Sequence, residues 1–205
     1  MFDKKELIWL SILGLSNVKT SKLLNCYGDI YNLWNVDYDD LMMSKILTDE
    51  EIARLMDLKK VNVIEDVYCE LKNKGVEIDL VNEDFIIERL NAIESKPNLL
   101  YRHGNLIKED NRAIAIIGAR RCTQYGMEIA YNLARDLAKY GFTIVSGMAE
   151  GIDSFAHRGA LSAGGRTIGV LGCGVDVCYP KSNKKLMGEI INNGCILSEY
   201  ALGET

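Results

Sequence analysis

Between residues 113 and 197, short apolar segments alternate with longer segments of helical periodicity, and this alternation constrains the fold more than any other feature. The apolar segments lie at residues 113–117, 142–145, 167–171 and 195–197, with helical patterns at 125–140, 153–162 and 183–192 between them. Strands that are apolar on both faces and connected through helices are typical of a parallel sheet covered on two sides. We therefore predict an α/β fold with a doubly wound, mostly parallel, Rossmann-like sheet.

The first sixty residues have a purely helical pattern. Apolar residues recur at helical spacing on both sides of a turn at 14–17, and further helices are expected at 30–33 and 49–58. We predict a small all-helical domain of the SAM or helix-hairpin-helix type over residues 1–60, and a Rossmann-like domain over 61–205. The second domain should begin with strands at 76–81 and 99–103 and a short helix near 85–93 between them.

The turn near Gly14 partly resembles a helix-hairpin-helix turn, in which backbone amides face a DNA phosphate. Ser16 replaces the second glycine of that pattern, and serine takes a positive φ less readily than glycine. The sequence allows two interpretations: the turn contacts DNA, or it is a simple turn within a helical bundle.

Composition indicates a cytoplasmic protein. No segment approaches the roughly 20 apolar residues that cross a bilayer, so we expect no membrane partner, and the N-terminus lacks a signal-peptide pattern. The six cysteines show no disulfide-type spacing, which fits a reducing compartment. Cys173, Cys178 and Cys195 with His157 are a weak metal-ligand set, because structural zinc sites usually have closer pairs. We predict buried thiols, no metal and no cofactor.

The two halves of the chain differ in charge. The net charge is −5, but residues 1–110 hold 14 Lys and Arg against 21 Asp and Glu, whereas residues 111–205 hold 10 against 8. A local cationic groove matters more for nucleic-acid binding than the total charge. Overall acidity therefore argues against broad non-specific binding and does not exclude DNA.

Glycines and basic residues follow the predicted strands, at the edge where a Rossmann-like sheet binds its ligand. Glycine lets a backbone approach an anion, and helix N-termini offer free N–H groups, so phosphate is the expected ligand. Arg and Lys nearby favour a phosphodiester chain over a carboxylate metabolite. The predicted DNA- and phosphate-binding residues are Gly118, Arg120, Arg121, Ser146, Gly147, Gly151, Gly172, Gly174, Lys181, Asn183 and Lys184.

Four polar residues near these loops are predicted to have structural roles: Asp153, His157, Ser198 and Glu199. Asp153 and His157 are four residues apart and share a helix face, where they would serve as a cap and a packed imidazole or, alternatively, as a catalytic base and its orienting group. No nucleophile with a convincing partner accompanies them. The sequence therefore predicts a protein that is not an enzyme.

Taken in order, the loops resemble the signatures of the DprA/Smf DNA-processing family. The matching segments are Gly118-Ala119-Arg120, Ser146-Gly147-x-Ala-x-Gly151-Ile152-Asp153, Ala156-His157-x-Gly159-Ala160-Leu161, Tyr179-Pro180-x-x-Asn183-x-x-Leu186 and Gly194-x-x-x-Ser198-Glu199. The resemblance implies a mediator of natural transformation and recombination that binds and protects single-stranded DNA and loads a RecA-type recombinase. It also implies a homodimer of the full-length protein.

The sequence departs from the family pattern in two places. Glu150 stands where the family often has a neutral or basic residue, and the chain ends at Thr205, before the family's C-terminal part. The resemblance therefore implies a truncated chain, which puts dimerisation and recombinase contact in question.

Three other function classes are alternatives to DNA binding. A dehydrogenase-like cofactor site needs G-x-G-x-x-G after the first parallel strand, and that pattern is missing. A nucleotide-binding or nucleotide-hydrolysing enzyme of the lysine-decarboxylase-like phosphoribohydrolase class shares the phosphate loops and is the main alternative, although its P-G-G-x-G-T-x-x-E signature is absent. A protein-interaction scaffold is the third.

Overall fold

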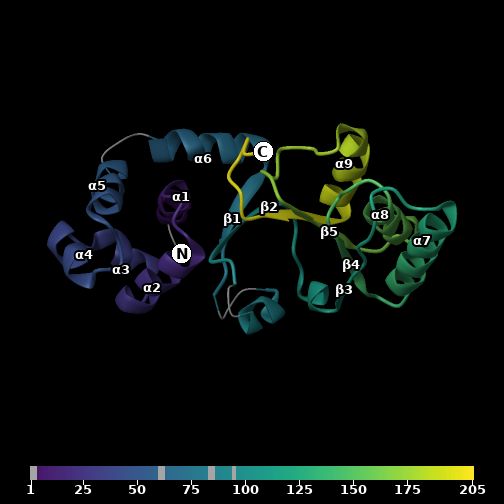
Figure 1. Cartoon of the computed structure of the whole chain (residues 1–205), viewed down its shortest axis with the longest axis horizontal. Coiled ribbons are helices and arrows are strands. Elements are labelled where there is room, and N and C mark those ends of the chain that lie inside the picture. Colours follow the sequence, from purple (N-terminus) through teal and green to yellow (C-terminus); the bar gives the residue numbers. More distant parts are fainter. Residues whose placement is uncertain (1–3, 60–62, 83–85, 94–95) are drawn as a thin grey trace.

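The structure of the chain is a computed structural model that describes residues 4–59, 63–82, 86–93 and 96–205. Helices form one end of the molecule, and the sheet with its covering helices forms the rest (Figure 1). The predicted boundary after residue 60 falls among residues 60–62, which lie outside the described residues.

A six-stranded sheet organises the molecule, in the order β1-β2-β6-β5-β4-β3. The four parallel strands are β3 (Ala113–Ala115), β4 (Thr143–Ser146), β5 (Thr167–Leu171) and β6 (Gly194–Ser198). At the other edge β1 (Val76–Leu80) and β2 (Leu99–Gly104) are antiparallel, and β2 pairs with β6. The α/β, mostly parallel, Rossmann-like prediction is confirmed, and the parallel strands follow one another in chain order.

The helices that connect the parallel strands cover one face of this sheet, whereas a doubly wound sheet has such helices on both faces. The crossover helices are α7 (Gln124–Lys139), α8 (Ile152–Ser162) and α9 (Lys184–Asn193). Ile144 of β4 packs against small residues of α7 and α8, such as Ala134 and Ala156. Because these side chains are small, the two helices approach each other closely. On the other face, Ile168, Cys195 and Leu197 pack against Leu106 in the connection after β2.

The N-terminal helices are α1 (Lys4–Ile12), α2 (Asn17–Tyr27), α3 (Ile30–Asn35), α4 (Tyr38–Ser44) and α5 (Asp49–Leu58). Helices α2 to α5 each begin at a capping side chain, namely Ser16, Asp29, Asp37 and Thr48. Thr48 and Glu51 make a capping box at α5, which satisfies backbone amides at both positions. Trp9 packs edge-on against Trp34 with a centroid distance of 5.1 Å and donates from Nε1 to the carbonyl of Leu55. The helical N-terminal prediction is confirmed.

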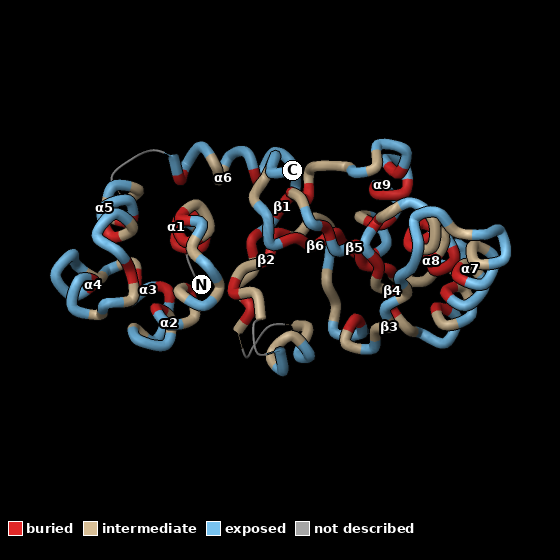
Figure 2. Tube along the Cα trace, in the orientation of Figure 1, coloured by how far each residue is buried: buried red, intermediate tan, exposed pale blue. Residues whose placement is uncertain are grey.

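One hydrophobic core continues from these helices to the sheet. Helix α6 (Val63–Lys74) packs against α1 and β1, and Leu7 and Ile8 belong to the same buried cluster as Ile78 and Tyr101. Figure 2 shows buried segments in the helical end and along the central strands. The N-terminal helices are therefore fixed against the β1 edge of the sheet.

The structure differs from the predicted elements in two places. The helix expected near 85–93 is a short 3-10 turn, η1 (Glu88–Ala92), preceded by residues 83–85, which are not described. Helix α4 was not predicted, because its seven residues give too short an apolar period. None of the helices in the described ranges is long and apolar enough to cross a membrane.

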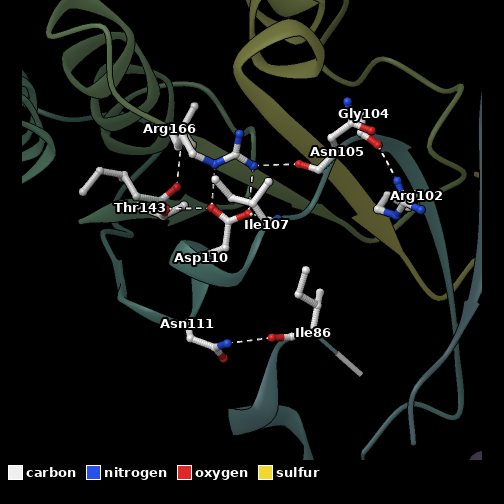
Figure 3. A network of polar contacts seen from close by, with 11 residues as sticks. Ile86, Arg102, Gly104, Asn105, Ile107, Asp110, Asn111, Thr143 and Arg166 are labelled. Carbon is white, nitrogen blue, oxygen red and sulfur yellow. Dashed lines mark hydrogen bonds and ion pairs between the residues drawn. The ribbon is translucent and has the colours of Figure 1, made fainter. Parts of the chain in front are cut away.

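A polar clamp holds the connection between β2 and β3 to the sheet (Figure 3). Asp110 in η2 (Lys108–Asn111) accepts hydrogen bonds from the guanidinium of Arg166, at 2.8 Å to each carboxylate oxygen, and from the hydroxyl of Thr143 at 2.8 Å. Arg166 also donates to the carbonyl of Asn105. Burial would raise the pKa of Asp110, but the hydrogen bonds from Arg166, Ile107 and Thr143 together lower it.

Candidate nucleic-acid interface

A pocket of about 490 Å³ opens at the carboxyl ends of β4 and β5. Because the loops after parallel strands meet at one edge of a sheet, residues distant in sequence line it together. The lining residues are Arg120, Gly147, Ala149, Glu150, Leu171, Gly172, Cys173, Val177, Tyr179, Pro180 and Thr205. Its walls thus combine one cation and one carboxylate with apolar and glycine surfaces, and we call it the strand-end pocket.

Asp153 connects two of the loops beside this pocket. Its carboxylate accepts from the amide of Gly118 after β3 at 3.2 Å, and from the amide of Gly147 after β4 at 3.1 Å. The side chain is buried, with 6% exposure for the residue. These two amides, which we expected to face a phosphate, donate to a carboxylate of the protein itself, so the anion they bind in this structure is Asp153.

The loop from β4 to α8 has an unusual backbone. Met148 has φ of 62° although it is not glycine, and its side chain is buried. Gly151 has φ of 77°, and a Cβ there would lie 2.4 Å from the carbonyl oxygen of Ala119. A close approach to the preceding strand's loop therefore requires glycine at 151.

Several predicted site residues are buried and engaged within the protein. The hydroxyl of Ser146 donates to the carbonyl of Ile116, and the side-chain Nδ2 of Asn183 donates to the carbonyl of Met148 at 2.8 Å. Ser198 donates to the carbonyl of Cys173 at 2.7 Å. These three side chains hold the loops in place, and the roles of Ser146 and Asn183 as direct DNA contacts stay predictions.

Four predicted cations stand exposed around the pocket: Arg120, Arg121, Lys181 and Lys184. Arg120 lines the pocket, and the two lysines flank the start of α9, directly after Pro180 in the pocket wall. None of the four forms an ion pair with a described residue, whereas Arg102, Arg135 and Arg166 do. Unpaired cations at a pocket rim are available to an anionic ligand.

The C-terminal segment forms one wall that sequence reasoning missed. The amide of Gly174 donates to the carbonyl of Glu204 at 2.8 Å, and the amide of Gly203 donates to Asp176 at 2.8 Å. Asp176 also pairs with Lys74 of α6 at 2.7 Å. Gly174 is therefore occupied inside the protein, while Gly172 is exposed and lines the pocket. The Tyr179-Pro180 dipeptide lines the same pocket as Thr205, and it is the sequence motif that points to this part of the pocket.

His157 lies outside the pocket. It is 0% exposed, and its Nδ1 is 2.7 Å from the hydroxyl of Thr167. The Thr167 hydroxyl donates to the carbonyl of Ile144, so it accepts from Nδ1–H of the histidine. Burial lowers the pKa of His157 to about 4. The neutral imidazole is packed between α8 and β5 and does not line the pocket.

We expect His157 to make the protein less stable as the pH falls from about 6.5 to 4, because the unfolded histidine takes up a proton there and the buried one does not. This loss of unfolding free energy reaches about 3 kcal/mol at pH 4, and it vanishes above the pKa of an unfolded histidine. His157→Asn keeps a donor for Thr167 and should flatten urea-unfolding free energies between pH 7 and pH 4.5. His103→Gln is the matched comparison, since burial also lowers the pKa of His103. Equal slopes for wild type and His157→Asn would contradict this.

The turn at the start of α2 faces the protein. Ser16 has a negative φ and caps α2, and the side chain of Asn17 donates to Glu199 at 2.8 Å. A cavity of about 370 Å³ beside the turn is lined by Glu199 and Glu204, among others. The carboxylates of Glu199 and Glu204 beside the turn would repel a phosphate. This favours the interpretation that the segment is a simple turn of the helical bundle.

The weak metal-ligand set of the sequence, Cys173, Cys178, Cys195 and His157, does not form a metal site among the described residues. Within the residues that the structure describes, no three His, Cys, Asp or Glu side chains are placed to hold a metal ion. Cys195 is buried on the sheet face opposite the helices, and burial raises the pKa of its thiol to about 12. Cys173 and Cys178 are only half-buried, so the prediction of buried thiols is confirmed within this set for Cys195 alone.

Comparison with known proteins gives a consistent result. A sequence profile of the family described as DNA recombination-mediator protein A matches residues 79–205. The chain is similar to the DNA processing protein DprA of Streptococcus pneumoniae, with 32% identity over 97% of this chain and 68% of that protein. It is also similar to the Smf protein of Synechocystis, with 43% identity over 54% of this chain and 29% of that protein. The chain thus spans only part of the length of these relatives.

Solved structures agree with the sequence matches. The X-ray structure of DprA from Streptococcus pneumoniae superposes with a TM-score of 0.78 at 30% identity, over 100% of this chain and 70% of that one. DNA processing protein A from Helicobacter pylori, described for its single-stranded DNA binding mode, superposes with a TM-score of 0.54 at 37% identity. That match covers 62% of this chain and 58% of the other.

Proposed function

Because this chain belongs to the DNA recombination-mediator protein A family, the DprA/Smf proteins, we propose that it binds single-stranded DNA at the strand-end pocket. The Helicobacter pylori relative is described as binding single-stranded DNA, which supports the same ligand here. One observation carries the proposal: Arg120 lines the pocket, Arg121 is next to it in sequence, Lys181 and Lys184 follow Pro180 of the pocket wall, and these four exposed cations form no ion pair with any residue that the structure describes.

The chemistry of the pocket supports a strand with unpaired bases. Cations spread over a rim neutralise successive phosphates, while apolar and aromatic walls accept the face of a base. Tyr179 is 67% exposed and lines the pocket together with Leu171 and Val177. In our proposal phosphates lie along the cations and Tyr179 stacks on a base.

We extend the proposal to the biological role. The family supports a cytoplasmic recombination mediator that protects single-stranded DNA during natural transformation and passes it to a RecA-type recombinase. A homodimer of the full-length protein belongs to the same proposal. Co-sedimentation with a recombinase on single-stranded DNA tests the transfer, and analytical ultracentrifugation tests the dimer.

The proposal assigns no catalytic turnover to the pocket. His157 is the candidate base of the enzyme alternative, and it is buried against Thr167 instead of lining the pocket. Asp153 is engaged by two backbone amides. Release of free base from a nucleoside monophosphate would overturn this part of the proposal.

Replacing Arg120 with alanine is expected to weaken single-stranded DNA binding by at least about tenfold, because a charge-assisted phosphate contact at the pocket is lost. Fluorescence anisotropy with a labelled oligonucleotide measures the affinity. A salt series should also give a slope smaller by about 0.7 for each phosphate contact removed.

Lys108→Ala is the matched control for this experiment. Lys108 is exposed and lies in η2, just before β3 begins, at the end of the parallel strands opposite the pocket. Its replacement removes one charge from the protein and should leave the affinity within about twofold, since the charge is remote from the rim. Equal losses for Arg120→Ala and Lys108→Ala would reject the pocket as the binding site.

A further inference from the structure

The outer surface of α8 is continuous with the rim of the strand-end pocket. Gly151, the residue before α8, packs so closely on the preceding loop that a Cβ there would lie 2.5 Å from the carbonyl oxygen of Arg120. Arg120 therefore sits at the amino end of this helix, beside the pocket that it lines. A strand leaving the pocket on this side meets α8 first.

Phe155, Arg158 and Ser162 form one stripe on α8, because residues three and four positions apart share a helix face. The other faces of α8 are used inside the protein: Ala156 and Ala160 pack in the core with α7, and Ser154 hydrogen-bonds Asn183 at 2.9 Å. In the stripe, Arg158 and Ser162 are exposed and Phe155 is half-buried. The stripe consequently faces solvent on the helical side of the sheet.

Arg158 is available to an anion. Among the described residues it forms no ion pair, unlike Arg135 and Lys139 on the neighbouring α7, which both pair with Asp136. An exposed cation three residues beyond a half-buried aromatic side chain, on the same helix face, is the combination that single-strand binding surfaces use.

We propose that single-stranded DNA continues from the strand-end pocket along this α8 stripe, with Phe155 stacking on a base and Arg158 contacting a following phosphate. This extension rests on the proposed function of the pocket. Arg158 is seven residues after Gly151, which places it about 10 Å along the helix axis at 1.5 Å per residue. A strand with a phosphate at every nucleotide reaches from Arg120 to Arg158 within a few nucleotides.

Oligonucleotide length separates the stripe from the pocket. We would measure the affinity of the whole chain for single strands of about five and about fifteen nucleotides, since binding sites of this kind span roughly 4–16 nucleotides. Arg158→Ala is expected to weaken binding of the longer strand about fivefold and to lower its salt slope by about 0.7. Binding of the shorter strand should stay within about twofold of wild type, because it fills the pocket alone.

Phe155→Leu is the second variant, because leucine keeps apolar volume against the helix and removes the ring. It should weaken binding of the longer strand about fivefold with an unchanged salt slope, since stacking is lost and no charge is removed. Lys108→Ala is again the control, and circular dichroism checks that each variant is folded. Unchanged affinity of the longer strand for folded Arg158→Ala would overturn the stripe, whereas failure of wild type to bind either strand would overturn the pocket itself.

Discussion

Asp153→Ala is expected to lower the free energy of unfolding by about 4 kcal/mol, because two amides inside the strand-end loops lose their acceptor and the amino end of α8 loses a negative charge. The carboxylate holds the amides of Gly118 and Gly147 together. Without it the loops after β3 and β4 separate, so we also expect single-stranded DNA binding to fall by more than about tenfold. Urea unfolding followed by circular dichroism measures the first effect, and anisotropy the second.

Two comparison variants sharpen this test. Asp153→Asn keeps one oxygen acceptor and turns an N–H₂ group toward the other amide, so its loss of stability should lie between wild type and alanine. Asp136→Ala removes an exposed carboxylate of α7 that pairs with Arg135, and its effect should stay below about 1 kcal/mol. If Asp153→Ala were as stable as Asp136→Ala and bound DNA normally, Asp153 would not organise the pocket.

Asp110→Ala is expected to cost about 3 kcal/mol of stability without a direct effect on DNA binding, because it removes the buried partner of a half-buried ion pair and leaves several hydrogen-bond donors without their acceptor. Asp110 is 1% exposed, and its removal deprives Arg166, Thr143 and the amide of Ile107 of their common acceptor (Figure 3). The wild-type contribution is present at neutral pH and is lost as the pH falls below the ordinary pKa of aspartate, since the folded pKa is lowered.

A double-mutant cycle isolates the clamp. Asp110→Ala combined with Arg166→Ala should destabilise the protein by less than the sum of the single changes, because neither charge is then left without its partner. At a temperature where Asp110→Ala is fully folded, its oligonucleotide affinity should match wild type within about twofold, since Thr143 and Thr167 mark the amino ends of strands whose carboxyl ends form the pocket. Additive losses of stability would contradict the clamp.

The parallel strands were predictable because their pattern is local. The segment at 167–171 is apolar on both faces and is bounded by glycines on both sides, and the structure has β5 at those residues. The helices between strands were likewise found within one or two residues, as for α8 at Ile152–Ser162. Local periodicity is enough here since each element is long enough to show its period.

The composition of the glycine loops did not predict which acceptor their backbone amides bind. A glycine amide after a strand can donate to a phosphate or to a nearby side chain, and the sequence is the same in both cases. Only the adjacency of β3 and β4 brings Gly118 and Gly147 to the same carboxylate. Likewise, the contact of Gly174 with Glu204 depends on the fold of the C-terminal segment.

The sequence by itself determined the α/β class, the helical N-terminal part, the loop motifs of the family and the cations that surround the pocket, because periodicity, glycine and charge are properties of neighbouring residues. Tertiary structure decided which of these groups face a ligand. It paired Asp153 with the loop amides, turned Asn17 toward Glu199, and left Arg120 and Arg158 exposed. Availability of a polar group depends on what packs beside it, and that is fixed by contacts between residues far apart in the chain.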